Sequence, residues 1–151
     1  MFGNQWRVLL GGAALCATLA GAVSAQTDIA AQREAFMKGM GGKVAVLVGM
    51  AQGRTAYDAA AATAAAGELQ GFAEQDWAPL FPAGSDADTL GKGKSLPKIW
   101  QNMDDFVAHQ QKLASAAAAL SAVAGDGLEA LKANVGAIGA ACGSCHEVYR
   151  K

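Results

Sequence analysis

Apolar residues recur at steps of three and four along most of the chain, which is the period of helices that each bury one face. The pattern predicts a first helix from Asp28 to about Gln52, a turn, and a second helix from Ala56 to about Trp77. Pro79 and Pro82 are expected to end the second helix. Glycines at positions 39, 41 and 42 each cost roughly 1 kcal/mol relative to alanine in a helix interior, so another group is expected to approach closely there.

A loop rich in Gly, Asp and Ser runs from Phe81 to Ser95 and precedes a third helix that is predicted to end at Gly125. Ser95 is the expected N-cap, with Pro97 in the first turn. His109 lies beside the apolar stripe of this helix and is expected on the surface. The stripe consists of Ile99, Trp100, Met103, Phe106, Val107, Leu113, Ala117, Leu120 and Val123.

The fourth helix has the clearest period, and Asp126 with Glu129 is predicted to form its capping box. Its apolar positions alternate steps of three and four, as in a helix that faces the inside of a bundle. They are Leu128, Leu131, Val135, Ile138, Cys142, Cys145 and Tyr149. Four helices of about twenty residues each predict an all-α fold, an antiparallel four-helix bundle.

The start of the chain is typical of a secretory signal peptide. Arg7 precedes an apolar run from Val8 to Val23, and small residues up to Ala25 predict cleavage after that residue. An uncleaved anchor is the alternative, although the run is slightly short for a spanning helix. Cleavage of residues 1–25 leaves one domain, residues 26–151, exported to the periplasm and not inserted in a membrane.

Composition and charge narrow the class of protein. The chain has a net charge of −1 and no basic cluster longer than Arg150-Lys151, so neither nucleic acid nor anionic lipid is an expected partner. It contains 19 glycines but only 3 prolines, and alanine is abundant, which favours closely packed helices.

Cys142-Gly143-Ser144-Cys145-His146 matches the attachment signature of c-type haem. On a helix, Cys142 and Cys145 project to one side, where each can form a thioether to haem, and His146 can reach the iron. The sequence therefore predicts one covalently attached haem c inside the bundle, with His146 at the edge of the core stripe. Haem or a neighbouring helix or subunit would explain the glycines of the first helix.

Three other roles are known for cysteines at this spacing. A redox dithiol would need a strand–helix–strand pattern nearby, and none is visible. Zinc would need a fourth ligand, but His109 is the only other His or Cys in the mature chain. A disulfide between Cys142 and Cys145 inside a helix would be strained and would leave His146 unexplained.

The position of the motif at the C-terminal end of four helices resembles the cytochrome c′ family, the class II c-type cytochromes, including its low-spin methionine-ligated members. The similar stretches are residues 33–38, 78–84, 99–106 and 141–150. The resemblance implies that Cys142 and Cys145 hold the haem and that His146 is the proximal iron ligand. It also implies that Arg33 and Arg150 lie near the haem edge, where Arg33 can pair with a propionate. A surface position is the alternative for either arginine.

The resemblance places Met37 on the far side of the iron, on the helical face of Arg33, and two functions remain open. If Met37 ligates the iron, the protein is expected to be a one-electron carrier for periplasmic redox partner proteins. If Met37 only caps the site, nitric oxide or carbon monoxide can bind. Plain core packing is the third possibility for Met37, and Met40 is a weaker candidate ligand.

An enzyme is not expected. Peroxide reduction would need an acid–base pair beside the iron, and neither Glu34 nor Lys38 is expected on the face of Met37. Members of the family often pair through their first two helices, and the glycines of the first helix and the alanine-rich second would permit such a homodimer.

Overall fold

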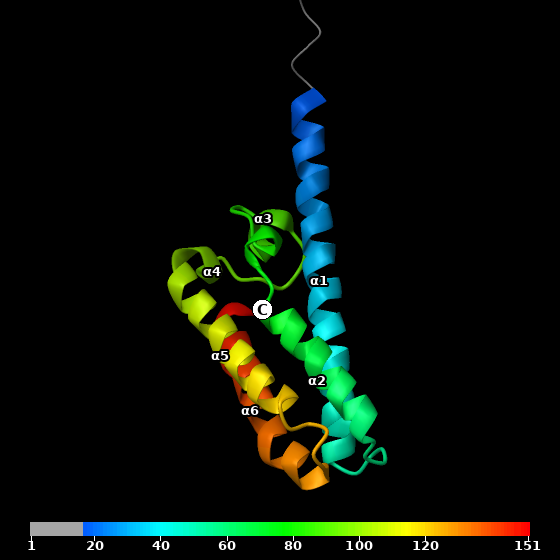
Figure 1. Ribbon diagram of the computed structural model, residues 1–151. Helices are drawn as coiled ribbons and strands as arrows, with labels where there is room; N and C mark the ends of the chain where they lie inside the picture. The colour runs from blue at the N-terminus through cyan, green and yellow to red at the C-terminus, as the bar shows by residue number, and fades with distance from the viewer. Residues whose placement is uncertain (1–16) are drawn as a thin grey trace, which may run out of the picture.

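The computed structural model describes residues 17–151, and side chains from Ile29 onward. The elements are α1 (Ala17–Ala51), α2 (Ala59–Glu74), a 3-10 turn η1 (Ala78–Leu80), α3 (Ala87–Leu90), α4 (Lys98–Gln101), α5 (Met103–Ser121) and α6 (Leu128–Tyr149). Among the four long helices, α1 packs on α2, α2 on α5, α5 on α6 and α6 on α1 (Figure 1). This closed ring confirms the predicted all-α four-helix bundle.

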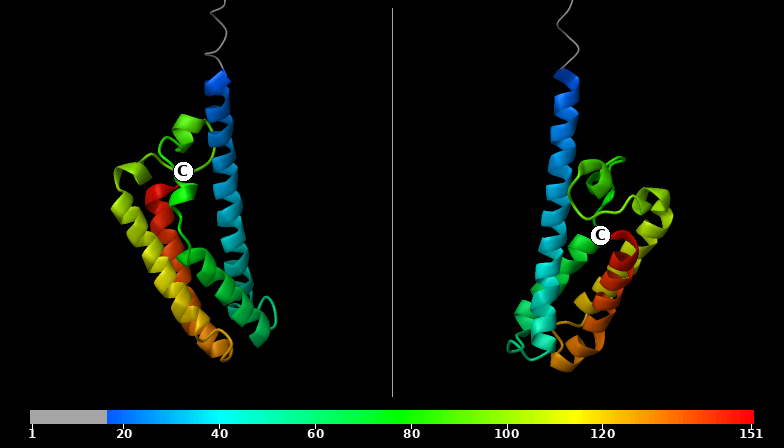
Figure 2. Two further views of the ribbon diagram at one scale, coloured as in Figure 1. Left: turned by 45° about the horizontal axis from the view of Figure 1, so that its top comes forward. Right: turned by 180° about the vertical axis from the view of Figure 1, so that it is seen from behind.

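Helix α1 begins at Ala17, well before the predicted start at Asp28. The preceding residues are rich in alanine and contain no proline, so nothing in the sequence stops the helix there. The N-terminal half of α1 extends past the other helices (Figure 2). Of the predicted signal peptide, residues 1–16 lie outside the described residues, and 17–25 belong to this helix. None of the helices in residues 17–151 is both long and apolar enough to cross a membrane.

Helix α2 starts at an Asp58 N-cap, whose carboxylate accepts from the Ala61 N–H at 2.7 Å. It ends at Glu74, before the predicted end at Trp77, and before either proline. The backbone adopts an extended conformation at Gln75. Trp77 can then bury its ring and donate its indole N–H to Phe72 O at 2.9 Å. Pro79 lies inside the turn η1 and does not terminate α2.

The predicted third helix is two helices, because the backbone at Asn102 leaves the helical region with φ −140° and ψ 52°. This break changes the phase of α5, so Met103 and Val107 of the predicted stripe are exposed. His109 takes a core position between Phe106 and Leu113, contrary to the expected surface location.

Two predicted helix caps are wrong. The Ser95 hydroxyl accepts a hydrogen bond from Arg33 instead of capping a helix. At α6, the N-cap is Gly127, with φ 125° and no side-chain cap, while Glu129 pairs with Lys132.

The predicted stripe of α6 does face the interior from Leu131 onward. Leu131 and Ile138 are fully buried and Tyr149 is nearly so, while Val135, Cys142 and Cys145 are packed against the core. Leu128, in the first turn, is only half-buried and lies outside this core. An aromatic cluster closes the haem-motif end of the bundle, with Phe106 edge-on to both Phe81 and Tyr149. This cluster positions the candidate site described next.

Candidate haem site

A cavity of about 600 Å³ lies between α1 and α6. Cys142, Cys145 and His146 line its α6 wall, and Met37 and Met40 line its α1 wall. Aromatic side chains from outside these two helices complete the lining: Trp77, Phe81 and Phe106. A volume of this size is ordinary for a site that holds a bulky organic cofactor.

Both cysteines are half-buried free thiols. Burial raises the pKa of Cys142. Burial raises the pKa of Cys145 to about 11, with smaller contributions from Cys142 and from the charge of Asp105. Redox-active and metal-binding cysteines instead have lowered pKa values, because the thiolate is the reactive form. The raised pKa values therefore argue against a dithiol exchange centre at this pair.

His146 lies at the exposed edge of the cavity. Burial of part of the ring lowers its pKa, and the charge of Arg150 lowers it further. Both effects favour the neutral imidazole, which is the form that ligates a metal. Among the described residues, no three His, Cys, Asp or Glu side chains gather into a metal-ion site, so the zinc alternative has no ligand set.

Arg33 is only 6% exposed, which contradicts the surface alternative. Its guanidinium donates to Leu80 O at 2.9 Å, to Ser85 O and Oγ at 3.0 and 2.7 Å, and to Ser95 Oγ at 2.8 Å. It also lies 4.5 Å from the centre of the Phe81 ring. Burial lowers the pKa of Arg33, and the charge of Asp86 opposes that effect.

These four bonds occupy most of the five N–H donors of the side chain, leaving one on Nη2. Arg33 lines the cavity, and its bonded partners are all uncharged. A buried cation without a bonded anion is unfavourable, so an anionic group in the cavity would stabilise it. With one N–H left, Arg33 can offer a single hydrogen bond to an anionic group in the cavity.

Arg150 lines the cavity with an exposed side chain, but its backbone is held in place. It forms an isolated antiparallel bridge with Ser95. On either side, Leu96 donates to Tyr149 O at 3.0 Å and Lys151 donates to Lys94 O at 2.8 Å. The C-terminus is thus anchored to the loop before α4, and Arg150 is not at a frayed end.

Met37 and Met40 both reach the cavity, and Met40 is the more buried, at 5% exposed. Glu34 and Lys38 also border the cavity, contrary to the expectation that they point away from the face of Met37. They form an exposed ion pair with each other at 2.7 Å, which places them at the rim.

Two sets of polar contacts were not predicted from the sequence: those of the buried His109, and those of Arg33 with Ser85 and Ser95. His109 fits the buried spacing between Phe106 and Leu113, so the stripe of α5 alone could have indicated its burial. Nothing in the sequence indicates that Ser85 and Ser95 bind Arg33, because these residues are more than fifty positions away from it.

A family model described as Cytochrome C′ matches residues 28–150. The chain belongs to the cytochrome c′ family. Cytochrome c-554 of Cereibacter sphaeroides is 40% identical over 119 residues, which are 79% of this chain and 78% of that protein. A solved cytochrome c′ from Rhodobacter Spheriodes has a TM-score of 0.80 at 34% identity, over 83% of this chain and 96% of that one. A ferrous variant of cytochrome c prime from Alcaligenes xylosoxidans with bound NO has a TM-score of 0.73 at 28% identity, over 83% and 97%.

Family membership makes this protein a monohaem c-type cytochrome with one covalently attached haem c and its iron. The cavity fits that cofactor in size and in chemistry. It combines two thiols, an imidazole and a buried guanidinium with apolar and aromatic walls.

Proposed function

We propose that this cytochrome is a one-electron carrier in which Cys142 and Cys145 hold the haem, His146 is the proximal ligand and Met37 is the sixth ligand. The observation that carries the proposal is that Met37 lines the α1 wall of the same cavity whose α6 wall carries the attachment motif. When bound, haem with a histidine and a methionine as axial ligands supplies a one-electron couple of raised potential.

The surrounding residues have supporting roles in this proposal. Arg33 binds one propionate and ties α1 to the loop that contains Ser85 and Ser95. Arg150 lies beside His146 and favours its neutral form. Glu34 and Lys38 lie at the rim of the cavity but are paired with each other, so neither has a catalytic role in this proposal.

The second candidate is a gas-binding cytochrome in which Met37 caps an open site for nitric oxide or carbon monoxide. Similarity to a solved family member with bound NO favours it. Apolar residues beside Met37, among them Met40 and Val44, offer no hydrogen bond to a bound diatomic.

Export completes the proposal. Residues 1–25 are cleaved as a signal peptide, and the mature protein exchanges electrons with redox partner proteins in the periplasm. A homodimer through α1 and α2 is also proposed, because Val46 of α1 is 42% exposed and Gly42 nearby has open space around it.

The absorption spectrum of the purified holoprotein tests the axial ligand. For the carrier, the reduced protein should show sharp, split visible bands and no response to carbon monoxide or nitric oxide. Met37→Ala should then broaden the bands and make them shift on addition of either gas. Met40→Ala is the matched control in the same cavity and should leave the spectrum unchanged.

Broad bands that shift with gas in the unmodified protein would instead establish the open site, with Met37 as its cap. Gas sensitivity that arises in Met40→Ala but not in Met37→Ala would reassign the ligand to Met40.

A further inference from the structure

A buried tyrosine links the haem cavity to a carboxylate on α5. Tyr149 lines the cavity, is 3% exposed, and donates its hydroxyl to Asp105 Oδ2 at 2.6 Å. Asn102 O lies farther from the hydroxyl, at 3.4 Å, and a hydroxyl has one hydrogen, so the carboxylate receives it. A distance this short is typical of a hydrogen bond to an ionised acceptor.

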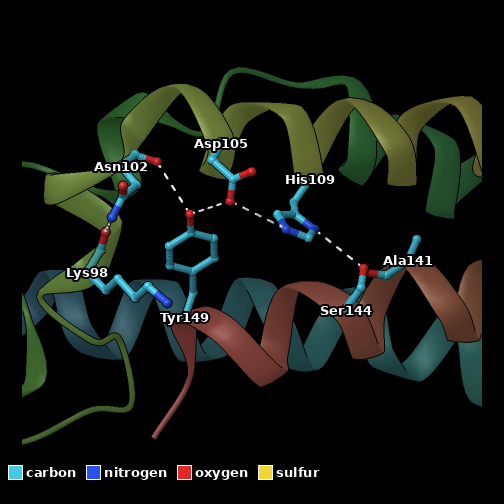
Figure 3. A network of polar contacts seen from close by, with 7 residues as sticks. All are labelled: Lys98, Asn102, Asp105, His109, Ala141, Ser144 and Tyr149. Atoms are coloured by element: carbon cyan, nitrogen blue, oxygen red, sulfur yellow. Dashed lines mark hydrogen bonds and ion pairs between the residues drawn. The ribbon is translucent and has the colours of Figure 1, made fainter.

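His109 approaches the same carboxylate from the other side, as Figure 3 shows. Its Nε2 lies 3.6 Å from Asp105 Oδ2, and its Nδ1 lies 3.4 Å from the hydroxyl of Ser144. The Ser144 hydroxyl donates its one hydrogen to Ala141 O at 3.2 Å, so its contact with Nδ1 does not fix the tautomer of His109. Asp105 Oδ2 accepts from Tyr149 across the helix pair and lies beside the His109 ring on its own helix.

This network lies directly behind the haem attachment motif. Ser144 sits between the two cysteines in the sequence, and Tyr149 follows His146 by one helical turn. The Asp105 charge also contributes to the raised pKa of Cys145, after burial and Cys142, and that of Tyr149, after burial. The carboxylate thus acts electrostatically on the wall of the cavity that carries the thiols.

We propose that Asp105 sets the reduction potential of the haem: its negative charge, held against α6 by Tyr149 and His109, favours the oxidised iron and lowers the potential. The physical reason is that the oxidised haem carries one more positive charge than the reduced haem. The inference rests on the proposed attachment through Cys142 and Cys145, and it holds whether Met37 ligates the iron or only caps it.

A redox titration of the holoprotein against mediators of known potential tests the proposal. Asp105→Asn removes the charge and keeps an oxygen that accepts from Tyr149. At a fixed ambient potential it should raise the ratio of reduced to oxidised protein by about threefold to tenfold, and tenfold corresponds to about 59 mV for one electron. A larger effect is not expected, because the Asp105 side chain is 59% exposed and solvent screens its charge.

Asp104→Asn is the matched control, since Asp104 has the same charge on the same turn of α5 and is exposed. Asp104→Asn should change the logarithm of the ratio of reduced to oxidised protein by less than half of the change that Asp105→Asn produces. Tyr149→Phe removes the hydroxyl that holds the carboxylate, so Asp105→Asn should have a smaller effect in that background than alone.

Equal shifts for the two aspartates, or none for Asp105→Asn, would overturn the proposal. Full additivity of Asp105→Asn with Tyr149→Phe would overturn the role of Tyr149 in holding the charge. Each variant is first denatured in alkaline pyridine, where the spectrum reports thioether attachment. A protein without thioethers there would contradict the proposed attachment itself, which separates that failure from a failure of Asp105.

Discussion

Gly39, Gly41 and Gly42 are near neighbours in α1 but have different surroundings. A Cβ at Gly39 would lie 3.0 Å from the Phe72 ring of α2, whereas Gly41 borders the cavity. A Cβ at Gly42 would meet nothing within 4 Å. The predicted close approach is therefore confirmed for a neighbouring helix at Gly39, while Gly41 leaves room at the cavity.

Gly39→Ala should therefore destabilise the protein relative to an open glycine replaced in the same way. Gly136→Ala in α6 is the control, because Gly136 is exposed, has open space and lies outside the proposed dimer face. Gly136→Ala should stabilise by about 0.5–1 kcal/mol through helix propensity. The free energy of unfolding of Gly39→Ala should be lower than that of Gly136→Ala by roughly 1–2 kcal/mol, because the Phe72 ring must move. Urea denaturation of the holoproteins measures both, and equal effects would show that the ring moves freely.

At the scale of elements, two turns that are distant in sequence share one side chain. Tyr57, before α2, donates its hydroxyl to Ala124 O at 2.9 Å and accepts from Gly127 N at 3.0 Å. These two backbone groups lie at the end of α5 and at the start of α6, where the helices leave carbonyl and N–H groups unpaired. The Gly127 N-cap has no side-chain acceptor of its own, so the tyrosine takes the place of the predicted capping box.

Tyr57→Phe should lower the free energy of unfolding by about 1–3 kcal/mol, since the ring remains and both backbone groups lose their partner. Ser115→Ala removes an exposed hydroxyl from α5 and should change the stability by less than about 0.5 kcal/mol. Thermal and urea unfolding of the holoproteins compare the two. An unchanged Tyr57→Phe protein would mean that water replaces the hydroxyl in the turn.

At the scale of the whole molecule, the described helices leave a large, mostly apolar cavity between α1 and α6. By the usual cost of about 24 cal/mol per Å³ of unfilled core, a cavity of this size is comparable to the entire stability of a domain. The opening of part of the cavity to solvent makes that an upper bound. The haem is therefore a part of the core as well as the redox group.

Association of two copies is the prediction at this scale. Sedimentation at micromolar concentration should give twice the mass of a single holoprotein chain. Val46→Lys, on the exposed face of α1, should reduce the sedimenting mass to that of one chain. Val107→Lys is the control, because Val107 is similarly exposed on α5, away from the proposed interface. A single-chain mass for the unmodified protein would contradict the dimer.

The sequence by itself determined the features that depend on local order: helical periodicity, the core stripe of α6, and a haem motif whose three reactive side chains share one turn and a half. These follow from the geometry of one helix, so no knowledge of the other helices is needed. The N-cap of α2 is also local, since Asp58 and its bonded N–H are three residues apart, but the apolar pattern placed the start of this helix at Ala56 and did not predict the cap.

Only the tertiary structure decided which polar groups are buried and what they bind. Arg33 meets Ser85 and Ser95, and Asp105 joins Tyr149 and His109 across two helices. Tyr57 binds both sides of the later turn between α5 and α6. The break at Asn102 set the phase of α5, which buried His109 and exposed Met103. Such contacts depend on the relative rotation and register of whole helices, which packing sets and which no single segment of sequence encodes.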